Sequence, residues 1–179
     1  YYIELVKDSK LQPIVLDVRC FALKNAIETL GTEVDFNEGP IAILEIGSHE
    51  NYLLILNKDT PFVSDIFVSA KDKELLGQKQ TDAGVLGQIT DRFAMQIKQN
   101  IQSYTSRFKS SKINKLFIVT NSLNYEDLMS EIEKKFQDLN VISLNPFQQM
   151  VVPAQIQEKI DIDDNKSAFT AVVGLATRK

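Results

Sequence analysis

The residues with the clearest chemical potential form one turn between two predicted strands. The turn reads Gly47-Ser48-His49-Glu50-Asn51 and follows an apolar run that ends at Ile46. Glycine lets the backbone approach a ligand closely, and backbone N–H groups beside a serine hydroxyl suit phosphate oxygens. Glu50 opposes this use, because a carboxylate repels a polyphosphate. Two interpretations follow, a phosphate-binding loop or an ordinary hairpin turn.

Carboxylates that could hold metal ions are scarce on the predicted elements. A two-metal nuclease needs several acids that converge from separate strands and helices. Glu45 is one such acid, but the strand run 116–119 and the last predicted helix contain none. The chain has one His and one Cys, which leaves no His-based triad, no His-rich metal site and no internal disulfide. We therefore predict no catalytic residue and no metal site, and we interpret His49 as solvated and Cys20 as a small core residue.

The overall composition indicates a globular protein that does not bind nucleic acid. Hydrophobic residues make up 44% of the 179 residues and charged residues 25%, which is enough for a packed core in one or at most two domains. The net charge is −4, whereas nucleic-acid binding depends on cations that neutralise phosphates. Apolar runs fall short of the ~18–20 residues of a membrane helix, so we expect no direct membrane insertion.

Hydrophobic periodicity predicts the elements that would position these residues. Apolar residues at helical spacing predict helices, and short continuous apolar runs predict buried strands. Asn124 and Ser167 are predicted to cap helices, and the polar stretch 32–40 is predicted to be a linker. The predicted helices are 1–9, 19–30, 89–108, 125–137 and 168–177; the predicted strands are 14–18, 41–46, 52–57, 62–68, 115–120 and 141–144; and segments 69–87 and 145–166 are expected to be irregular.

The order of these elements is typical of a ribonuclease H-like fold. Three strands in a meander, followed by helix, strand, helix, strand and helix, imply an α/β fold with a mixed five-stranded sheet flanked by helices, because parallel crossovers need a helix to return. Each lobe of an actin-like ATPase has this fold. Because the elements before the linker complete no core of their own, we predict a fragment of a two-lobed protein. Residues 1–37 would be the end of the first lobe and the inter-lobe crossing, and 38–179 the second lobe.

Four short motifs, in order along the chain, resemble the type IV pilus assembly protein PilM family. They are Pro13 to Leu23, Ile41 to Gly47, Asn145-Pro146-Phe147, and Ala171 to Arg178. The similarity is to the last half to two-thirds of PilM-family proteins and extends over essentially the whole chain. Where the family has an Asp and two threonines around its second phosphate loop, this chain has Glu45, His49 and Asn51. That departure resembles the relatives that serve mannose-sensitive haemagglutinin (MSHA) pili, the MshI proteins.

The resemblance implies an actin-like platform protein for biogenesis of a type IV or MSHA-type pilus rather than an enzyme. It implies a cytoplasmic location, peripheral at the inner membrane through a PilN-like single-pass partner, with contacts to other platform proteins and to further copies of itself. It places Gly47, Ser48, Asn51 and Gly174 in a degenerate nucleotide cleft, although helix packing is the other interpretation of Gly174. We expect no cofactor in this chain, with ATP and magnesium as an alternative for the full-length protein.

Two rival functions stay open at this point. A working ATPase of the actin or sugar-kinase type would need a first phosphate loop before Tyr1. An FtsA-like cell-division protein normally ends in a basic amphipathic membrane helix, and this sequence ends at Arg178-Lys179 without one.

Overall fold

One mixed sheet organises the molecule. The computed structural model describes residues 2–10, 12, 17–29, 34–46, 51–58, 61–161 and 165–178. Within them the sheet order is β3-β2-β1-β4-β5; β1 pairs antiparallel with β2 and β2 with β3, while β1 pairs parallel with β4 and β4 with β5. The predicted mixed five-stranded α/β sheet is therefore confirmed. The strands are β1 (Ile41–Ile46), β2 (Asn51–Leu56), β3 (Pro61–Asp65), β4 (Lys115–Thr120) and β5 (Asn140–Ser143).

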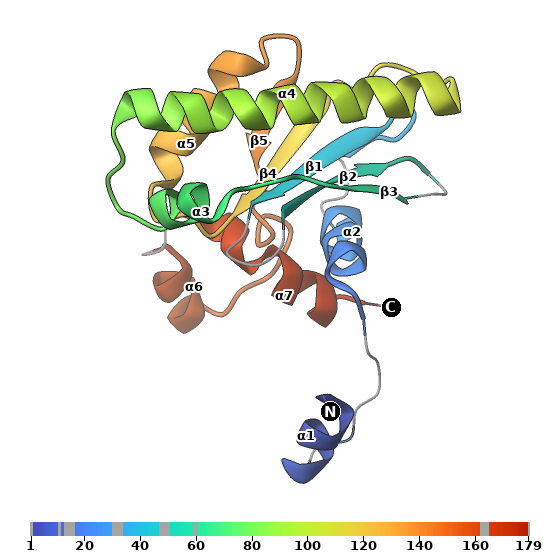
Figure 1. Cartoon of the computed structure of the whole chain (residues 1–179). Coiled ribbons are helices and arrows are strands. Elements are labelled where there is room, and N and C mark those ends of the chain that lie inside the picture. Colours follow the sequence, from blue (N-terminus) through green and yellow to red (C-terminus); the bar gives the residue numbers. More distant parts are fainter. Residues whose placement is uncertain are drawn as a thin grey trace.

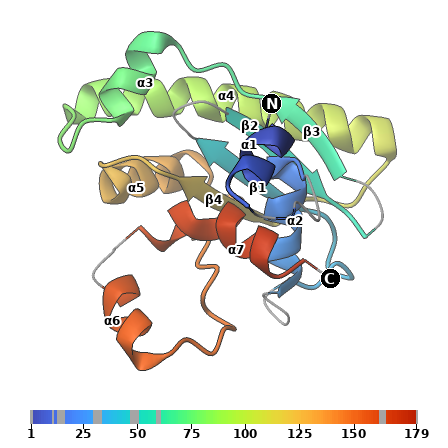
Figure 2. The same cartoon turned by 90° about the horizontal axis from the view of Figure 1, so that it is seen from below.

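Helices cover both faces of the sheet. Figure 1 shows α4 lying along one face with α5 beside it, and α2 and α7 on the opposite face; α1 stands away from the sheet. Figure 2 shows α2 and α7 side by side on the near face of the sheet. None of the described helices is long and apolar enough to cross a membrane. The helices are α1 (Tyr2–Asp8), α2 (Arg19–Thr29), α3 (Ala70–Leu76), α4 (Ala83–Phe108), α5 (Tyr125–Lys135), α6 (Ala154–Asp161), the 3-10 helix η2 (Lys166–Phe169) and α7 (Thr170–Ala176).

The central strand β1 is buried along its whole length. Its side chains alternate between the two faces, as the period of two in a strand requires. Ala42, Leu44 and Ile46 belong to the core under α4 and α5. Ile41 and Ile43 belong to the second core, under α2. A strand with helices on both sides reads as a continuous apolar run, which is why the sequence predicted its bounds correctly.

The long helix α4 contributes most of the helical side of the larger core. Ile89, Phe93, Ile97 and Tyr104 are buried on one face of the helix, as their spacing predicts, and Leu86 joins them. Phe108, which the same spacing places on this face, is 48% exposed. The helix begins six residues before Ile89, at Ala83, because the Asp82 side chain accepts hydrogen bonds from the N–H groups of Gly84 and Val85 at 2.9 and 3.1 Å. Such an N-cap satisfies donors that the helix itself leaves free.

The second core depends on a close crossing of α2 and α7. An added Cβ at Gly174 of α7 would lie 1.7 Å from the carbonyl oxygen of Ala22 in α2, so only glycine fits there. An ion pair of 2.6 Å between Arg178 and Asp17 joins the same two segments. The packing interpretation of Gly174 is thus confirmed. Helix α2 belongs to residues 1–37, the predicted end of the first lobe, but it packs on the sheet formed by residues 38–179. The division between lobes at residue 37 stays a prediction.

Two helices lie in segments that the sequence predicted to be irregular. Helix α3 forms within 69–87, where the Ser69 hydroxyl accepts a hydrogen bond from the Asp72 N–H at 3.1 Å and Leu76 is buried. Helix α6 lies within 145–166 and begins after Pro153, whose carbonyl accepts hydrogen bonds from Ile156 and Gln157. Both helices are short, seven and eight residues, and one or two turns give too little periodicity to detect.

Three further sequence predictions are resolved at the element ends. Of the predicted strand 14–18, residues 14–16 lie outside the described part, and Asp17 and Val18 are irregular residues that lead into α2. Asn124 is the N-cap of α5 but makes no side-chain capping bond. Ser167 lies within η2, before α7, and its hydroxyl bonds to β4 instead of capping the last helix.

Candidate functional site

The sequence proposed four residues as contacts for a nucleotide, and the structure describes two of them. Gly47 and Ser48 lie in 47–50, outside the described residues. Asn51 begins β2, where it pairs with Ile46 and its carbonyl accepts the Ile66 N–H at 2.8 Å. Gly174 turns its bare α-carbon towards α2. Membership of these residues in a nucleotide cleft stays a prediction.

Glu45 forms an ion pair with Arg19 and is not part of a cluster of acids among the described residues. Its side chain is 2% exposed and lies between the cross-strand neighbours Tyr52 and Val119, and one carboxylate oxygen accepts a hydrogen bond from the Arg19 guanidinium at the start of α2. Among the described residues, the second carboxylate oxygen and the Tyr52 hydroxyl have no hydrogen-bond partner. Burial raises the pKa of Tyr52 well above its ordinary value, and the adjacent Glu45 raises it further. Glu45 therefore ties α2 to the sheet.

A cluster of polar side chains gathers where β4 ends, and we call it the β4-end cluster. The Thr120 carbonyl accepts a hydrogen bond from the Asn165 amide at 2.8 Å, and the Ser167 hydroxyl lies 3.2 Å from the Thr120 N–H. Ser167 also donates to the Asn165 side chain at 2.7 Å. The last backbone N–H and carbonyl groups of β4 therefore form hydrogen bonds with side chains 45 to 47 residues later in the chain, in place of bonds to a neighbouring strand.

The same cluster extends from the strand end to α3 and α5. The Ser122 hydroxyl donates to the Leu76 carbonyl at the end of α3 at 2.7 Å and accepts the Asn124 N–H at 3.3 Å. The Ser122 N–H donates to the Thr120 hydroxyl at 3.1 Å. Asn124 is 6% exposed, and its side-chain amide nitrogen has no hydrogen-bond partner in the part of the chain that the structure describes. A buried donor of this kind has hydrogen-bonding capacity to offer a ligand.

Two cavities open beside the β4-end cluster. The larger, about 740 Å³, lies at the start of α5 and is lined by Lys79, Gln80, residues 121–127, Asn165 and Ala168. The smaller, about 190 Å³, lies between the ends of β1 and β4 and the end of α3, against Ile46, Leu76 and Thr120. Both are at the carboxyl ends of the parallel strands β1 and β4, the edge at which ligands bind in open α/β sheets.

The lining of the larger cavity suits a polar ligand of low charge. Hydroxyl and amide groups are the most frequent in it, and its charged residues are Lys79, Glu126 and Asp127. One cation against two acids does not favour a polyanion. Among the described residues no group of three or more His, Cys, Asp or Glu side chains gathers to hold a metal ion. The arrangement offers hydrogen-bonding groups around an open cavity, which suits binding of a polar ligand.

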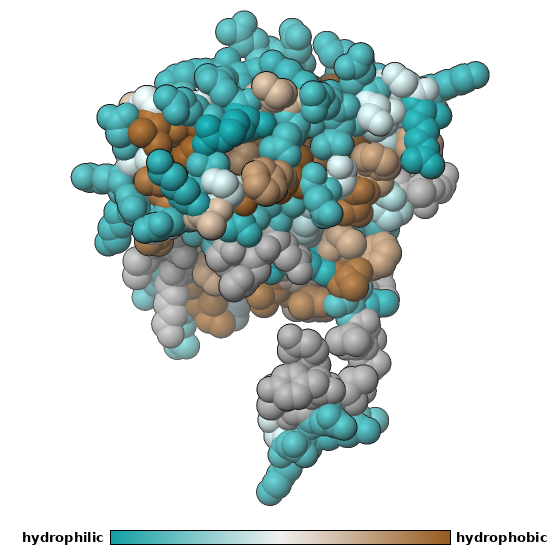
Figure 3. Space-filling view, viewed as in Figure 1, coloured by the Kyte–Doolittle hydropathy of each residue, from teal (hydrophilic) through white to brown (hydrophobic). Residues whose placement is uncertain are grey.

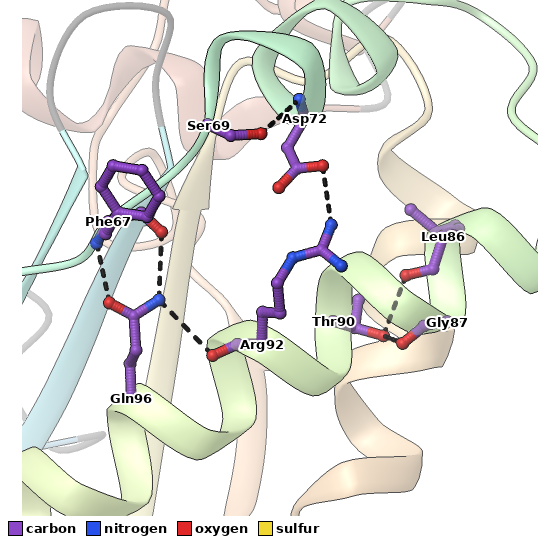
Figure 4. Close-up of polar contacts among 8 residues, drawn as sticks. All are labelled: Phe67, Ser69, Asp72, Leu86, Gly87, Thr90, Arg92 and Gln96. Carbon is purple, nitrogen blue, oxygen red and sulfur yellow. Dashed lines mark hydrogen bonds and ion pairs between the residues drawn. The ribbon is translucent and has the colours of Figure 1, made fainter.

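Contacts with α4 fix the elements that frame the smaller cavity. Figure 4 shows Gln96 of α4 bonded to both backbone groups of Phe67, accepting from the N–H at 2.8 Å and donating to the carbonyl at 3.0 Å. Arg92, one turn earlier on α4, binds the Asp72 carboxylate of α3 at 2.7 Å. Asp72 is buried while Arg92 is half exposed. These contacts hold α3 and the segment before it against α4.

The turn Asn145-Pro146-Phe147 also matches its prediction in part. The Asn145 side chain accepts the Phe147 N–H at 3.1 Å, which is the local bond expected of a turn. Phe147 is half-buried rather than buried, and its ring lies 5.7 Å from that of Phe169. The turn thereby connects the end of β5 to η2.

Sequence reasoning did not identify the β4-end cluster. A signal for its first half exists, because the polar run Thr120-Asn121-Ser122 follows directly after a buried apolar strand. The second half lies far along the chain, with Asn165 in a stretch predicted to be irregular and Ser167 predicted only to cap the last helix. Only the return of the chain to the end of β4 brings the two halves together.

Comparisons with known proteins identify the fold. No protein-family model matches the sequence, and no curated protein matches it. Among solved structures, a chain of a PilM-PilN type IV pilus biogenesis complex matches with a TM-score of 0.72 and 20% sequence identity. The match covers 98% of this chain and 55% of the matched chain. The protein therefore shares its fold with a component of a PilM-PilN complex, as the resemblance of its sequence to the PilM family implied.

Proposed function

We propose that this chain belongs to an actin-like platform protein for biogenesis of a type IV pilus, acting as a binding and assembly module. The observation that carries the proposal is the fold likeness to a chain of a PilM-PilN complex over nearly the whole of this sequence. The partner would be a PilN-like single-pass protein of the inner membrane. The protein would then lie on the cytoplasmic side and reach the membrane through that partner. The MSHA pilus is the system that the departures at Glu45, His49 and Asn51 favour.

The two-lobed, ribonuclease H-like organisation is part of the same proposal. The chain spans 55% of the length of the solved chain it matches. On the outer face of α7, Val172 and Leu175 are more than half exposed, and Phe169, at the end of η2, is 39% exposed. Figure 3 shows hydrophobic residues on the side of the molecule where α2 and α7 lie. An exposed apolar stripe on a surface helix supports a further packed layer, which the second lobe of an actin-like protein would supply.

A pull-down tests the proposal. The cytoplasmic tails of the inner-membrane pilus proteins from the same genome are immobilised, and full-length protein is applied. We expect the PilN-like tail to retain the protein and a tail of scrambled sequence to retain none. Retention by none of the inner-membrane tails would contradict the platform function.

Nucleotide binding is the second candidate function, because the cavity at the carboxyl ends of β1 and β4 has the position and size of a small-molecule site, although its two acids oppose a polyphosphate. Its volume of about 740 Å³ is within the usual range for small-molecule sites. Calorimetry of the full-length protein with magnesium ATP separates this candidate from the first. Micromolar binding that is lost on replacing Gly47 or Ser48 supports an ATPase, and the absence of heat supports an assembly module that works without nucleotide. If a nucleoside without phosphates binds and ATP does not, the polar cavity binds the nucleoside and residues 47–50 do not act as a phosphate-binding loop.

A further inference from the structure

A further pocket, distinct from the two cavities described above, lies at the opposite ends of the parallel strands, and we call it the lysine pocket. It has a volume of about 410 Å³ and lies between α4, the segment that leads into β4, and the segment from the end of α5 to β5. Because the segments before β4 and β5 form it, it lies at the amino ends of the parallel strands. The β4-end cluster lies at their carboxyl ends, so the two sites are separate.

The floor of the lysine pocket is apolar. Ile113 and Phe136 are 1% and 5% exposed and belong to the main core, and Ile101 and Leu139 pack against that core from the rim. The pocket is therefore a place where the core reaches the surface. An apolar side chain that entered it would lose its contact with water and gain packing against these groups, at roughly 25 cal/mol per Å² of buried apolar area.

The rim of the pocket is positively charged. Lys98, Lys112 and Lys135 line it, against one acid, Asp138. The ammonium group of Lys98 lies 5.4 Å from the centre of the Phe136 ring, and Lys135 binds Asp91 at 2.7 Å. Within the part of the chain that the structure describes, Lys98 and Lys112 form no ion pair. Lys98 and Lys112, neither in an ion pair among the described residues, therefore stand above an apolar floor in a chain whose net charge is −4.

We propose that the lysine pocket binds a short acidic segment of a partner protein that inserts one apolar side chain between its carboxylates. The floor accepts the apolar side chain, and Lys98 and Lys112 accept the carboxylates, since opposite charges at a rim steer and orient a partner. A peptide fits this pocket better than a membrane surface does. The cations border a hollow rather than a flat face. This inference does not depend on the proposed pilus function.

Fluorescence polarisation tests the proposal with a defined probe on the protein itself. The probe is a fluorescein-labelled peptide of sequence Asp-Glu-Phe-Leu-Asp-Glu. Its two controls replace either the acids by their amides or the two apolar residues by glycine. We expect saturable binding of the probe that weakens with added salt, and binding at least about tenfold weaker for either control peptide, equivalent to ~1.4 kcal/mol. No saturable binding of the probe up to about 1 mM, the weak end of specific recognition, would overturn the proposal.

A matched pair of variants locates the binding. Lys98→Glu with Lys112→Glu reverses the two free cations of the rim, and Lys7→Glu with Lys71→Glu makes the same change of net charge on exposed residues elsewhere. We expect the first variant to weaken the probe at least about tenfold and the second less than about twofold. If both variants lose the same affinity for the probe, the probe is attracted by net charge alone and the proposed binding site is wrong. Binding to vesicles of phosphatidylglycerol is measured as well. If the protein binds the vesicles but not the peptide, and only the first variant loses vesicle binding, the pocket binds lipid and the proposal is wrong.

Discussion

Replacing Gly174 by alanine tests the helix crossing that closes the second core. The added Cβ would lie 1.7 Å from the Ala22 carbonyl oxygen, 2.6 Å from the Ala22 carbonyl carbon and 3.1 Å from the Ala26 nitrogen. Ordinary contacts begin near 3.4 Å, so the closest pair must separate by about 3.4 − 1.7 = 1.7 Å along its line of contact. All three atoms belong to the backbone of α2, and no side-chain rotation can move them aside.

The free energy follows from two opposing terms. Overpacking a well-filled core costs about 1–3 kcal/mol, and the upper part of that range applies because a whole helix must shift. Alanine is a better helix former than glycine by about 1 kcal/mol, which offsets part of the cost. We expect Gly174→Ala to lower the free energy of unfolding by about 2 kcal/mol. For a chain of this size that corresponds to a fall in Tm of roughly 4–8 °C.

Urea denaturation followed by circular dichroism measures the effect, with the slope of free energy against urea as a check that the unfolding stays two-state. Gly87→Ala is the matched control, because Gly87 also lies within a helix and its added Cβ would meet only the Glu131 carboxylate at 3.7 Å. The control should be more stable than wild type by about 0.5–1 kcal/mol. If Gly174→Ala is as stable as wild type while Gly87→Ala gains stability, α2 and α7 do not cross as closely as described.

Two further predictions concern buried polar groups. Tyr52→Phe should leave stability unchanged or raise it at neutral pH, because the hydroxyl has no hydrogen-bond partner among the described residues. The raised pKa of Tyr52 means that the unfolded chain alone loses this proton above about pH 10, so wild-type stability falls there by up to ~1.4 kcal/mol per pH unit. Denaturation at several alkaline pH values should show a shallower fall in the variant, and an equal fall would refute the assignment. Ser122→Ala should cost about 1–3 kcal/mol, because it leaves the Leu76 carbonyl without its partner. Thermal unfolding measures this loss. The control is Ser130→Ala, at an exposed position, whose stability should stay within about 0.5 kcal/mol of wild type. If the two variants have the same Tm, the prediction is wrong.

Local sequence patterns predicted most of the fold. The strands 41–46 and 115–120 agree with the structure residue for residue, since strands buried on both faces are continuous apolar runs with polar residues at each end. The apolar face of α4 could also be predicted, because the apolar spacing repeats over about five turns of helix. Helices α3 and α6 were missed because a helix of one or two turns repeats that spacing too few times.

The candidate site was less accessible to sequence reasoning. Gly47 and Ser48 were proposed from local turn chemistry and lie outside the described residues. The β4-end cluster and the lysine pocket each draw on segments that are far apart in the chain. Lys98 and Lys135 are 37 positions apart, on different helices, and no periodic pattern relates them.

The sequence by itself determined the order and kind of the major elements, and with them a mixed sheet whose parallel crossovers need helices on its faces. Tertiary structure alone decided which polar groups meet. Ser167 bonds to the end of β4 rather than capping its own helix, and Gly174 is required because the backbone of another helix fills the space of its side chain. The physical reason is range: backbone periodicity is set by neighbours a few residues away, whereas these contacts form only when the sheet brings distant segments within bonding distance.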